Sequence, residues 1–70
     1  MQVDFPRALE DYNAALELSP DLAVALYNRG TVKYRMGDYA EAEKDLKRAA
    51  EAEPDNKEFQ EGLSECQKQL

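Results

Sequence analysis

The sequence contains no histidine and a single cysteine, Cys66. A disulfide needs two cysteines, and zinc sites are built mainly from clustered cysteine and histidine, so neither is expected within one chain. Ser19 and Ser64 have no histidine to act as a general base, which excludes hydrolases of the Ser–His–Asp type. Carboxylates are abundant, but no motif sets two of them in a cleft. We therefore expect no catalytic residue, no metal and no cofactor, and the chain is predicted not to be an enzyme.

Long apolar segments and basic clusters are also missing. The longest apolar run ends at Tyr27 and is far shorter than the roughly 20 residues of a membrane-spanning helix. Nine basic residues stand against 15 acidic ones, and the net charge of −6 argues against binding to nucleic-acid phosphates. No basic and then apolar segment opens the chain as a secretory signal would. The expected partners are proteins or peptides, not nucleic acid or membrane, and the expected location is intracellular, in the cytoplasm.

The sequence matches itself when it is shifted by 34 residues. The identical pairs are Asp4/Asp38, Ala8/Ala42, Asp11/Asp45, Ala15/Ala49, Glu17/Glu51, Pro20/Pro54 and Asp21/Asp55. A fixed period of this length is typical of proteins built from stacked helical units.

The spacing of apolar residues predicts four helices and no strand. They are expected over residues 4–18, 22–36, 38–53 and 56–69. An aspartate suited to capping the first turn stands at or just before the start of each helix, namely Asp4, Asp21, Asp38 and Asp55. Asp38 with Glu41, and Asp55 with Glu58, resemble capping boxes. The linkers are short, so consecutive helices should be antiparallel neighbours and the fold all-α.

Small residues, a turn and a proline fall in phase with this period. Gly30, Ala42, Leu46 and Pro54 occupy one complete unit over residues 21–54, with Gly37 just past a helix end, where positive φ is common. Ala8, Tyr12 and Pro20 occupy the second helix of a preceding unit. In these positions the chain resembles the tetratricopeptide repeat family, whose pattern has a 34-residue period and a closing proline. The resemblance implies an α-solenoid fragment forming one domain over residues 1–70, in which 56–69 is a terminal or capping helix.

Three positions depart from that family pattern, the first being Leu26 at the position of the family's tryptophan. Arg29 stands where the family has leucine, and Lys33 where it has tyrosine. Both lie on a helix stripe that should be partly buried, where their stems can pack while the charged ends reach water or a carboxylate. Asp45 and Asp11, equivalent residues of successive units, are the predicted partners of Arg29. A structural pair is favoured over a ligand contact.

The resemblance also implies a concave groove lined by the first helix of each repeat, where peptide ligands bind in the family. On this chain the corresponding residues are Val24, Tyr27, Asn28, Thr31, Tyr34 and Arg35. The simpler interpretation is an ordinary half-exposed helix face. Farther along, Glu58, Glu61 and Glu65 would make the groove acidic and favour a basic or amphipathic peptide. The predicted function is a protein–protein interaction module that presents this groove to a peptide or a partner helix.

One subgroup of the family, the carboxylate-clamp repeats, binds acidic C-termini. Asn28 matches the central asparagine of the clamp. The Lys and Arg positions one repeat later are Glu58 and Gly62 here, so a clamp is not expected.

An alternative function is a structural fragment that acts by self-association. On the helix over 4–18, Ala8 and Ala15 are expected to face the second helix. The other side carries an apolar stripe that no helix covers: Phe5, Leu9, Tyr12 and Leu16. About three repeats are usually needed for a stable stack, so a homodimer or a helix swap through this stripe is the expected form. The last helix is predicted to bury a core stripe of Phe59, Leu63, Cys66 and Leu70.

Overall fold

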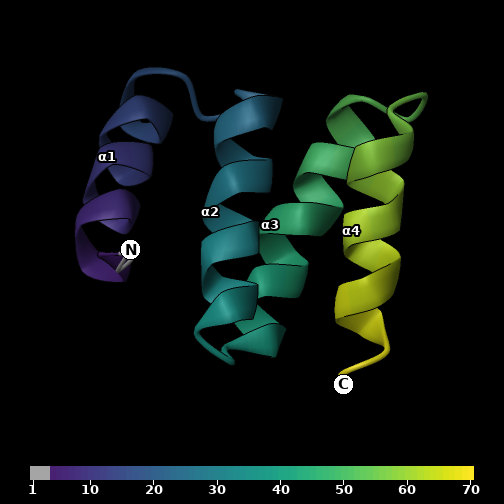
Figure 1. Cartoon of the computed structure of the whole chain (residues 1–70). Coiled ribbons are helices and arrows are strands. Elements are labelled where there is room, and N and C mark those ends of the chain that lie inside the picture. Colours follow the sequence, from purple (N-terminus) through teal and green to yellow (C-terminus); the bar gives the residue numbers. More distant parts are fainter. Residues whose placement is uncertain (1–3) are drawn as a thin grey trace.

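The computed structural model describes residues 4–70, so the first three residues of the predicted 1–70 domain lie outside the described part. Four helices follow one another: α1 Phe5–Leu18, α2 Ala23–Arg35, α3 Tyr39–Ala52 and α4 Lys57–Gln67. They run antiparallel to their neighbours in the order of the chain (Figure 1). Residues 4–70 contain no strand, which confirms the predicted all-α repeat fold.

The helices form a stack in which α2 is central. It packs against α1 on one side and α3 on the other, and α4 packs against α3 and touches α2. The most deeply buried large side chains are Leu26 of α2, Leu46 of α3 and Cys66 of α4. One core cluster joins α1, α2, α3 and Phe59 of α4, and a second joins Leu46 with Cys66. The described helices include none that is both long and apolar enough to cross a membrane.

The first helix begins as predicted. The carboxylate of Asp4 accepts a hydrogen bond from the backbone N–H of Arg7 at 3.1 Å, and Pro6 occupies the first turn. Gly37 has a φ of +85°, which is the left-handed conformation expected after the end of α2.

The other three caps differ from the prediction. Leu22, not Asp21, is the N-cap of α2 and offers no side-chain acceptor. Asp38 is the N-cap residue of α3 but makes no capping hydrogen bond, and Glu41 pairs with Lys44 at 2.8 Å instead of closing a capping box. At α4 the cap is Asn56, whose side-chain oxygen accepts from Phe59 N–H at 3.2 Å, one residue later than Asp55. At α4 two polar residues, Asp55 and Asn56, stand side by side, and the turn geometry selects Asn56.

Gly30 allows α2 and α3 to approach closely. A Cβ built at Gly30 would lie 2.8 Å from Cγ of Leu46 and 3.2 Å from the carbonyl oxygen of Ala42. Real Cβ atoms do not come so close to other heavy atoms, so a larger residue would force the two helices apart.

We expect Gly30→Ala to destabilise the protein even though alanine is the better helix former. Alanine gains about 1 kcal/mol in helix propensity, but overpacking of a core costs about 1–3 kcal/mol, so the expected net loss is about 1 kcal/mol. Urea unfolding followed by circular dichroism measures the difference. A variant as stable as the parent would contradict the close approach of α2 and α3.

Most apolar residues of α1 lie on one face of the helix. This corrects the prediction that Ala8 and Ala15 face α2 while a separate apolar stripe lies on another side. Leu16 is only 8% exposed and belongs to the core cluster, and Ala15 packs against the same cluster. Phe5, Leu9 and Tyr12 are half-buried. On a helix these residues and Ala8 fall within an arc of about 120°, so all of them turn toward α2 together. Leu16 is therefore not part of an uncovered stripe.

The predicted core stripe of α4 is mostly present. Phe59 and Cys66 are buried and Leu63 packs against both clusters. Leu70 is 63% exposed because α4 ends at Gln67, before the stripe reaches it. Within the core, Sγ of Cys66 donates to the carbonyl oxygen of Tyr39 at 3.3 Å. Burial raises the pKa of this thiol, and the nearby Glu43 carboxylate adds to the effect.

We expect Cys66 to react slowly with thiol reagents in the folded protein. The thiolate is the reactive form, and both burial and the raised pKa oppose it. At pH 8 labelling should be roughly a hundredfold or more slower than in denaturing urea, because reaction waits for α4 to open. A labelling time course followed by mass spectrometry measures both rates, and equal rates would show that α4 does not cover the thiol.

Candidate functional site in the groove between α2 and α4

A small pocket opens between α2 and α4 over a floor supplied by α3. Its volume is about 190 Å³, and it is lined by Tyr27, Thr31, Tyr34, Leu46, Gly62 and Glu65. We call it the α2–α4 pocket. Three of its residues, Tyr27, Thr31 and Tyr34, belong to the groove face predicted on α2. They are four and three residues apart, so they stand in a row on one side of the helix.

Tyr27 forms one wall of this pocket, and its ring packs against α4. Its ring stacks on Phe59 with centroids 4.8 Å apart and an interplanar angle of 24°. A Cβ at Gly62 would lie 2.9 Å from a ring carbon of Tyr27, so glycine at this position leaves the room that the ring occupies. The ring is held in place before any ligand arrives, which lowers the entropy cost of binding against it.

Tyr34 and Thr31 complete the α2 side. The Tyr34 ring meets Tyr39 of α3 edge-on, with centroids 5.2 Å apart. The Thr31 hydroxyl donates to the carbonyl oxygen of Tyr27 at 2.8 Å and is thereby engaged within the helix. The pocket therefore offers two positioned aromatic rings over the apolar side chain of Leu46.

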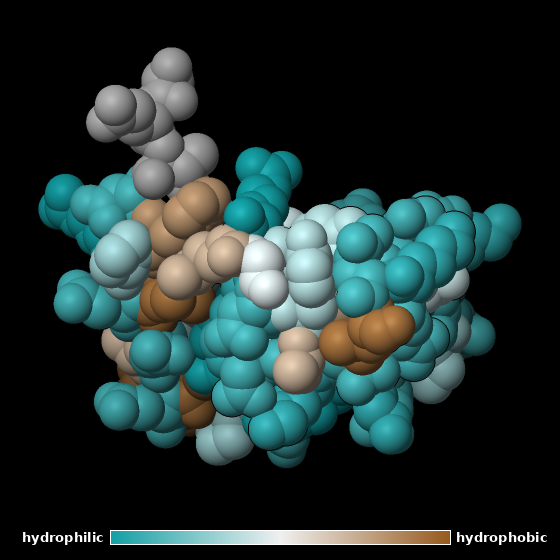
Figure 2. Space-filling view, turned by 90° about the horizontal axis from the view of Figure 1, so that it is seen from below, coloured by the Kyte–Doolittle hydropathy of each residue, from teal (hydrophilic) through white to brown (hydrophobic). Residues whose placement is uncertain are grey.

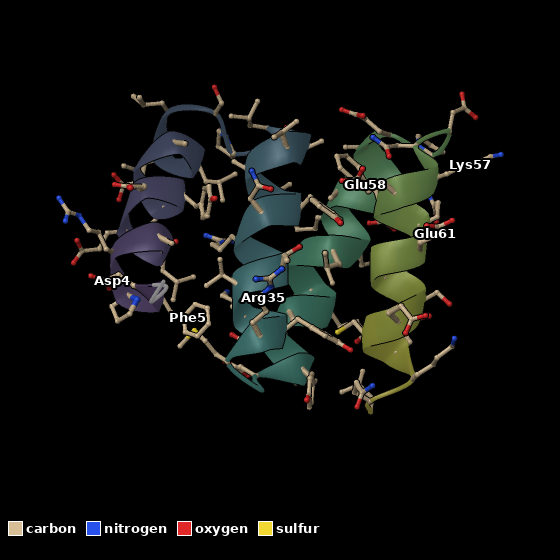
Figure 3. The ribbon with its side chains drawn as sticks, in the orientation of Figure 1. Asp4, Phe5, Arg35, Lys57, Glu58 and Glu61 are labelled. Atoms are coloured by element: carbon tan, nitrogen blue, oxygen red, sulfur yellow. The ribbon has the colours of Figure 1, made fainter. Side chains whose placement is uncertain are left out.

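The other predicted groove residues surround this pocket without lining it. Val24 is 55% exposed, Asn28 is half-buried and Arg35 is exposed. Figure 3 shows Arg35 at the front of α2. The Asn28 side chain makes no hydrogen bond to any residue between 4 and 70, so its amide is free to bond a ligand.

The acidic residues of α4 do not all face the groove. Glu65 lines the α2–α4 pocket and pairs with Lys68 at 3.2 Å. Glu58 lies on the side of α4 that faces α2, whereas Glu61 points outward, away from α2 (Figure 3). On a helix Glu58 and Glu65 are seven residues apart and share a face, but Glu61 is rotated from that face by about 40–60°.

Reasoning from the sequence missed Leu46 and Gly62 as pocket residues. Leu46 fits the family pattern, and in the structure it packs with Ala42 and Cys66 while also forming the floor of the pocket. Gly62 carried a usable signal, because a glycine in the middle of a helix costs about 1 kcal/mol relative to alanine and often marks a close approach.

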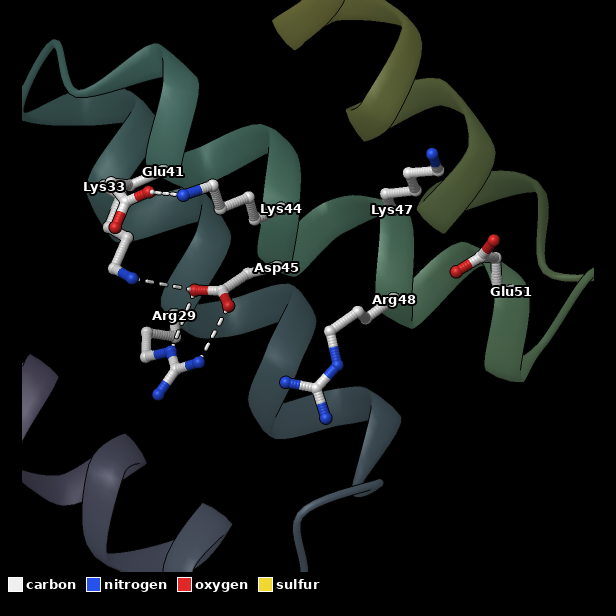
Figure 4. Close-up of a pocket in the computed structure, with 8 residues that line it drawn as sticks. All are labelled: Arg29, Lys33, Glu41, Lys44, Asp45, Lys47, Arg48 and Glu51. Atoms are coloured by element: carbon white, nitrogen blue, oxygen red, sulfur yellow. Dashed lines mark hydrogen bonds and ion pairs between the residues drawn. The ribbon is translucent and has the colours of Figure 1, made fainter.

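An ion cluster lies on the opposite side of α2. Nε and Nη2 of Arg29 donate to the two carboxylate oxygens of Asp45 at 2.8 and 2.7 Å, and Nζ of Lys33 lies 3.1 Å from the same carboxylate (Figure 4). The predicted Arg29–Asp45 pair is present. Asp11, the other predicted partner, is exposed, and the third Arg29 bond goes to Oδ1 of Asn13 at 2.9 Å.

The Asp45 carboxylate is charged in spite of its burial. Its side chain is 5% exposed, and this burial by itself would raise the pKa. Hydrogen bonds from Arg29 and Lys33 outweigh burial and hold the pKa of Asp45 below its ordinary value. The same bond to Asp45 raises the pKa of Arg29. Every buried polar side-chain atom in the described part of the chain has a partner, so the cluster is structurally complete.

This lowered pKa predicts a stability that depends on pH. The contribution of Asp45 is fully present above its unfolded pKa of about 4 and is lost as pH falls through the lower folded pKa. We expect the difference in unfolding free energy between the parent and Asp45→Asn to shrink between pH 5 and pH 2. Urea unfolding of both proteins across that range measures it. A difference independent of pH would contradict the assignment.

The comparisons with known proteins agree with this architecture. A sequence model of the tetratricopeptide repeat family matches residues 2–61. The chain is 41% identical over 63 residues to sperm-associated antigen 1 of Rattus norvegicus, covering 90% of this chain and 7% of that protein. It is 38% identical over 58 residues to protein O-mannosyl-transferase TMTC1 of Mus musculus, covering 83% of this chain and 6% of that protein.

A bacterial relative shows the same similarity. The photosystem I assembly protein Ycf3 of Acaryochloris marina is 41% identical over 46 residues, which are 66% of this chain and 28% of that protein. The chain therefore spans a small part of each of these relatives. The family match covers most of the chain and agrees with the four antiparallel helices and the 34-residue period. The chain belongs to the tetratricopeptide repeat family.

Proposed function

We propose that the chain is a non-enzymatic protein-interaction module that binds a peptide or a partner helix in the groove between α2 and α4. The observation that carries the proposal is the α2–α4 pocket, in which Tyr27 and Tyr34 are both held by other aromatic rings. Rigid tyrosines combine a large apolar surface with a polar tip and lose little entropy on binding. Asn28 beside them supplies a free amide.

The charges of the groove favour a basic or amphipathic ligand. Glu65 stands at the pocket and Glu58 on the same face of α4, while Arg35 is the basic residue at the other side. An aliphatic stem lying along the two tyrosine rings would bring a lysine or arginine head within reach of Glu65. A free C-terminal carboxylate would meet a carboxylate there, which is unfavourable.

A peptide array tests this function directly. Basic amphipathic peptides should bind more tightly than acidic C-terminal peptides, and the double variant Asn28→Ala with Glu65→Ala should weaken that binding. Both positions are solvent-accessible, so the fold should survive, which circular dichroism checks. A matched control on the other side of the stack is Glu17→Ala. Acidic C-terminal peptides that bind most tightly and lose that binding in the double variant, or equal losses in the control, would contradict the proposal.

Self-association is a second candidate function, favoured by the end of the stack at α1. Phe5, Leu9 and Tyr12 remain half exposed there, and Met36 is 48% exposed. Seen from below, Figure 2 shows tan and brown side chains gathered at the α1 end of the molecule. A symmetric homodimer pairing two copies of this patch, or a swapped helix, would cover it.

Sedimentation at micromolar concentration tests the dimer. Leu9→Glu should shift a dimer to a monomer, whereas Leu18→Glu, a change at a position 88% exposed, should not. Leu16→Glu is unsuitable because Leu16 is part of the core. A monomer at all concentrations, or a dimer unaffected by Leu9→Glu, would exclude association through this patch.

A further inference from the structure

The basic residues of this acidic chain are concentrated on one face. A hollow of about 560 Å³ is lined by five of the nine: Arg29, Lys33, Lys44, Lys47 and Arg48 (Figure 4). Three carboxylates, Glu41, Asp45 and Glu51, complete the lining. We call these eight residues the basic face. It carries a net charge of +2, whereas the rest of the chain has four basic and twelve acidic residues.

The basic face lies on the side of the stack away from the α2–α4 pocket. On α2, Arg29 and Lys33 are rotated by about 200° from the row formed by Tyr27, Thr31 and Tyr34. Two smaller hollows adjoin it, and Arg48 lines all three. Together they make a trough that runs from α3 over α2 to the turn between α1 and α2, with Arg48 at its centre.

The cations of the basic face are not equally engaged. Arg29 and Lys33 share the buried carboxylate of Asp45. Lys44 is 73% exposed and pairs with Glu41 at the surface, an interaction that solvent screens. Lys47 makes no ion pair within residues 4–70.

Arg48 is oriented but not saturated. One Nη2 bond goes to the carbonyl oxygen of Pro20 at 3.0 Å, and the same nitrogen is 3.8 Å from the exposed Asp21. A guanidinium has five N–H donors, so most of them remain free for another acceptor. Lys44 lies one turn before Lys47 and Arg48 on α3, about 4.5 and 6 Å from them along the axis, and all three offer positive charge to a ligand.

The geometry points to a second interaction surface, in which the basic face binds a short acidic segment of a partner protein. Glutamates spaced by three or four residues on a helix match the spacing of Lys44, Lys47 and Arg48. Nucleic acid fits less well. A long polyanion leaving the basic face would meet the rest of the chain, whose net charge is −8, beginning with Glu17 and Asp21 in the adjoining hollows, whereas a short segment ends within the basic face. With the groove on its other side, the module would join two partners of opposite charge.

The test uses a fluorescein-labelled decaglutamate peptide and the whole 70-residue chain. Fluorescence anisotropy should detect binding that weakens as salt rises. Lys44→Glu with Lys47→Glu should weaken it by about tenfold, since two exposed ion pairs are lost and the reversed charges add repulsion. The matched control is Lys57→Glu with Lys68→Glu, the same change of charge on and just beyond α4, and it should cost much less.

Other outcomes would overturn the inference. Equal losses in the two double variants would mean an effect of net charge alone. Equal affinity for decaglutamine, whose side chains are uncharged, would mean that the basic face does not recognise acidic residues. Tighter binding of a single-stranded decanucleotide would assign the face to nucleic acid. Sedimentation showing that a second copy of the chain occupies the basic face would assign the face to self-association. Asn28→Ala with Glu65→Ala should leave decaglutamate binding unchanged, so this site and the groove fail independently.

Discussion

Replacing Leu46 with alanine is expected to remove a large part of the protein's stability. Leu46 is 2% exposed, packs against Gly30 of α2 and lies 3.8 Å from the position of a Cβ at Gly62 of α4. It therefore joins three helices. Replacing a buried leucine with alanine loses apolar burial and leaves a cavity, which typically lowers the unfolding free energy by about 2–5 kcal/mol. A domain of 70 residues has a net stability of roughly 4–10 kcal/mol, so the loss is a large part of the total.

Circular dichroism during urea unfolding measures this loss. Leu18→Ala is the matched control because Leu18 is 88% exposed on α1, and its unfolding free energy should change by about 0.5 kcal/mol or less. The shorter side chain should also deepen the α2–α4 pocket, since Leu46 forms its floor. Similar effects of the two substitutions would contradict the burial of Leu46.

Removing Arg29 is expected to produce the second large effect. In Arg29→Ala the buried Asp45 carboxylate loses a two-point bond and keeps the single contact to Lys33. Hydrogen bonds to charged groups are worth about 1.5–3 kcal/mol, and Lys33 compensates in part, so a loss of about 1–3 kcal/mol is expected. Arg29→Leu should cost less, because leucine restores apolar packing at a side chain that is 19% exposed.

Thermal unfolding of the parent, Arg29→Ala and Arg29→Leu compares the two. Lys44→Ala is the control. It also removes one positive charge and one ion pair, but this pair lies on the exposed surface, so the melting temperature should stay unchanged. Equal losses for Arg29→Ala and Arg29→Leu would count against a buried pair, since the pair predicts that packing recovers part of the loss.

The sequence by itself determined the repeat and the order of the helices. The 34-residue period, the prolines at Pro20 and Pro54 and the glycine at Gly37 are local signals, and each depends on backbone conformations that neighbouring residues control. The cap at Asp4 was equally local, because Asp4 directly precedes α1 and both of its neighbours in the sequence, Val3 and Phe5, are apolar. The family pattern placed Gly30 and Ala42 at the crossing of α2 and α3, where both are buried.

Choices between equivalent residues needed the tertiary structure. Asp11 and Asp45 occupy the same position in successive repeats, yet Asp45 is the one that binds Arg29, because it is buried against α2 whereas Asp11 is exposed on α1 and Asn13 contacts Arg29 from that helix. Asn56 caps α4 in place of Asp55 for a similar reason, since the turn decides which side chain reaches a free N–H.

The two surfaces also depended on packing between helices. The α2–α4 pocket exists because Gly62 leaves room for the Tyr27 ring. This close approach joins α2 and α4, which are not consecutive in the sequence. The face of α1 was misjudged because a periodic stripe shows which residues share a side, not which neighbour covers that side. Leu16 lies in the core for this reason. Periodicity is a property of one helix, whereas coverage and charge clustering are properties of how the helices are arranged in space.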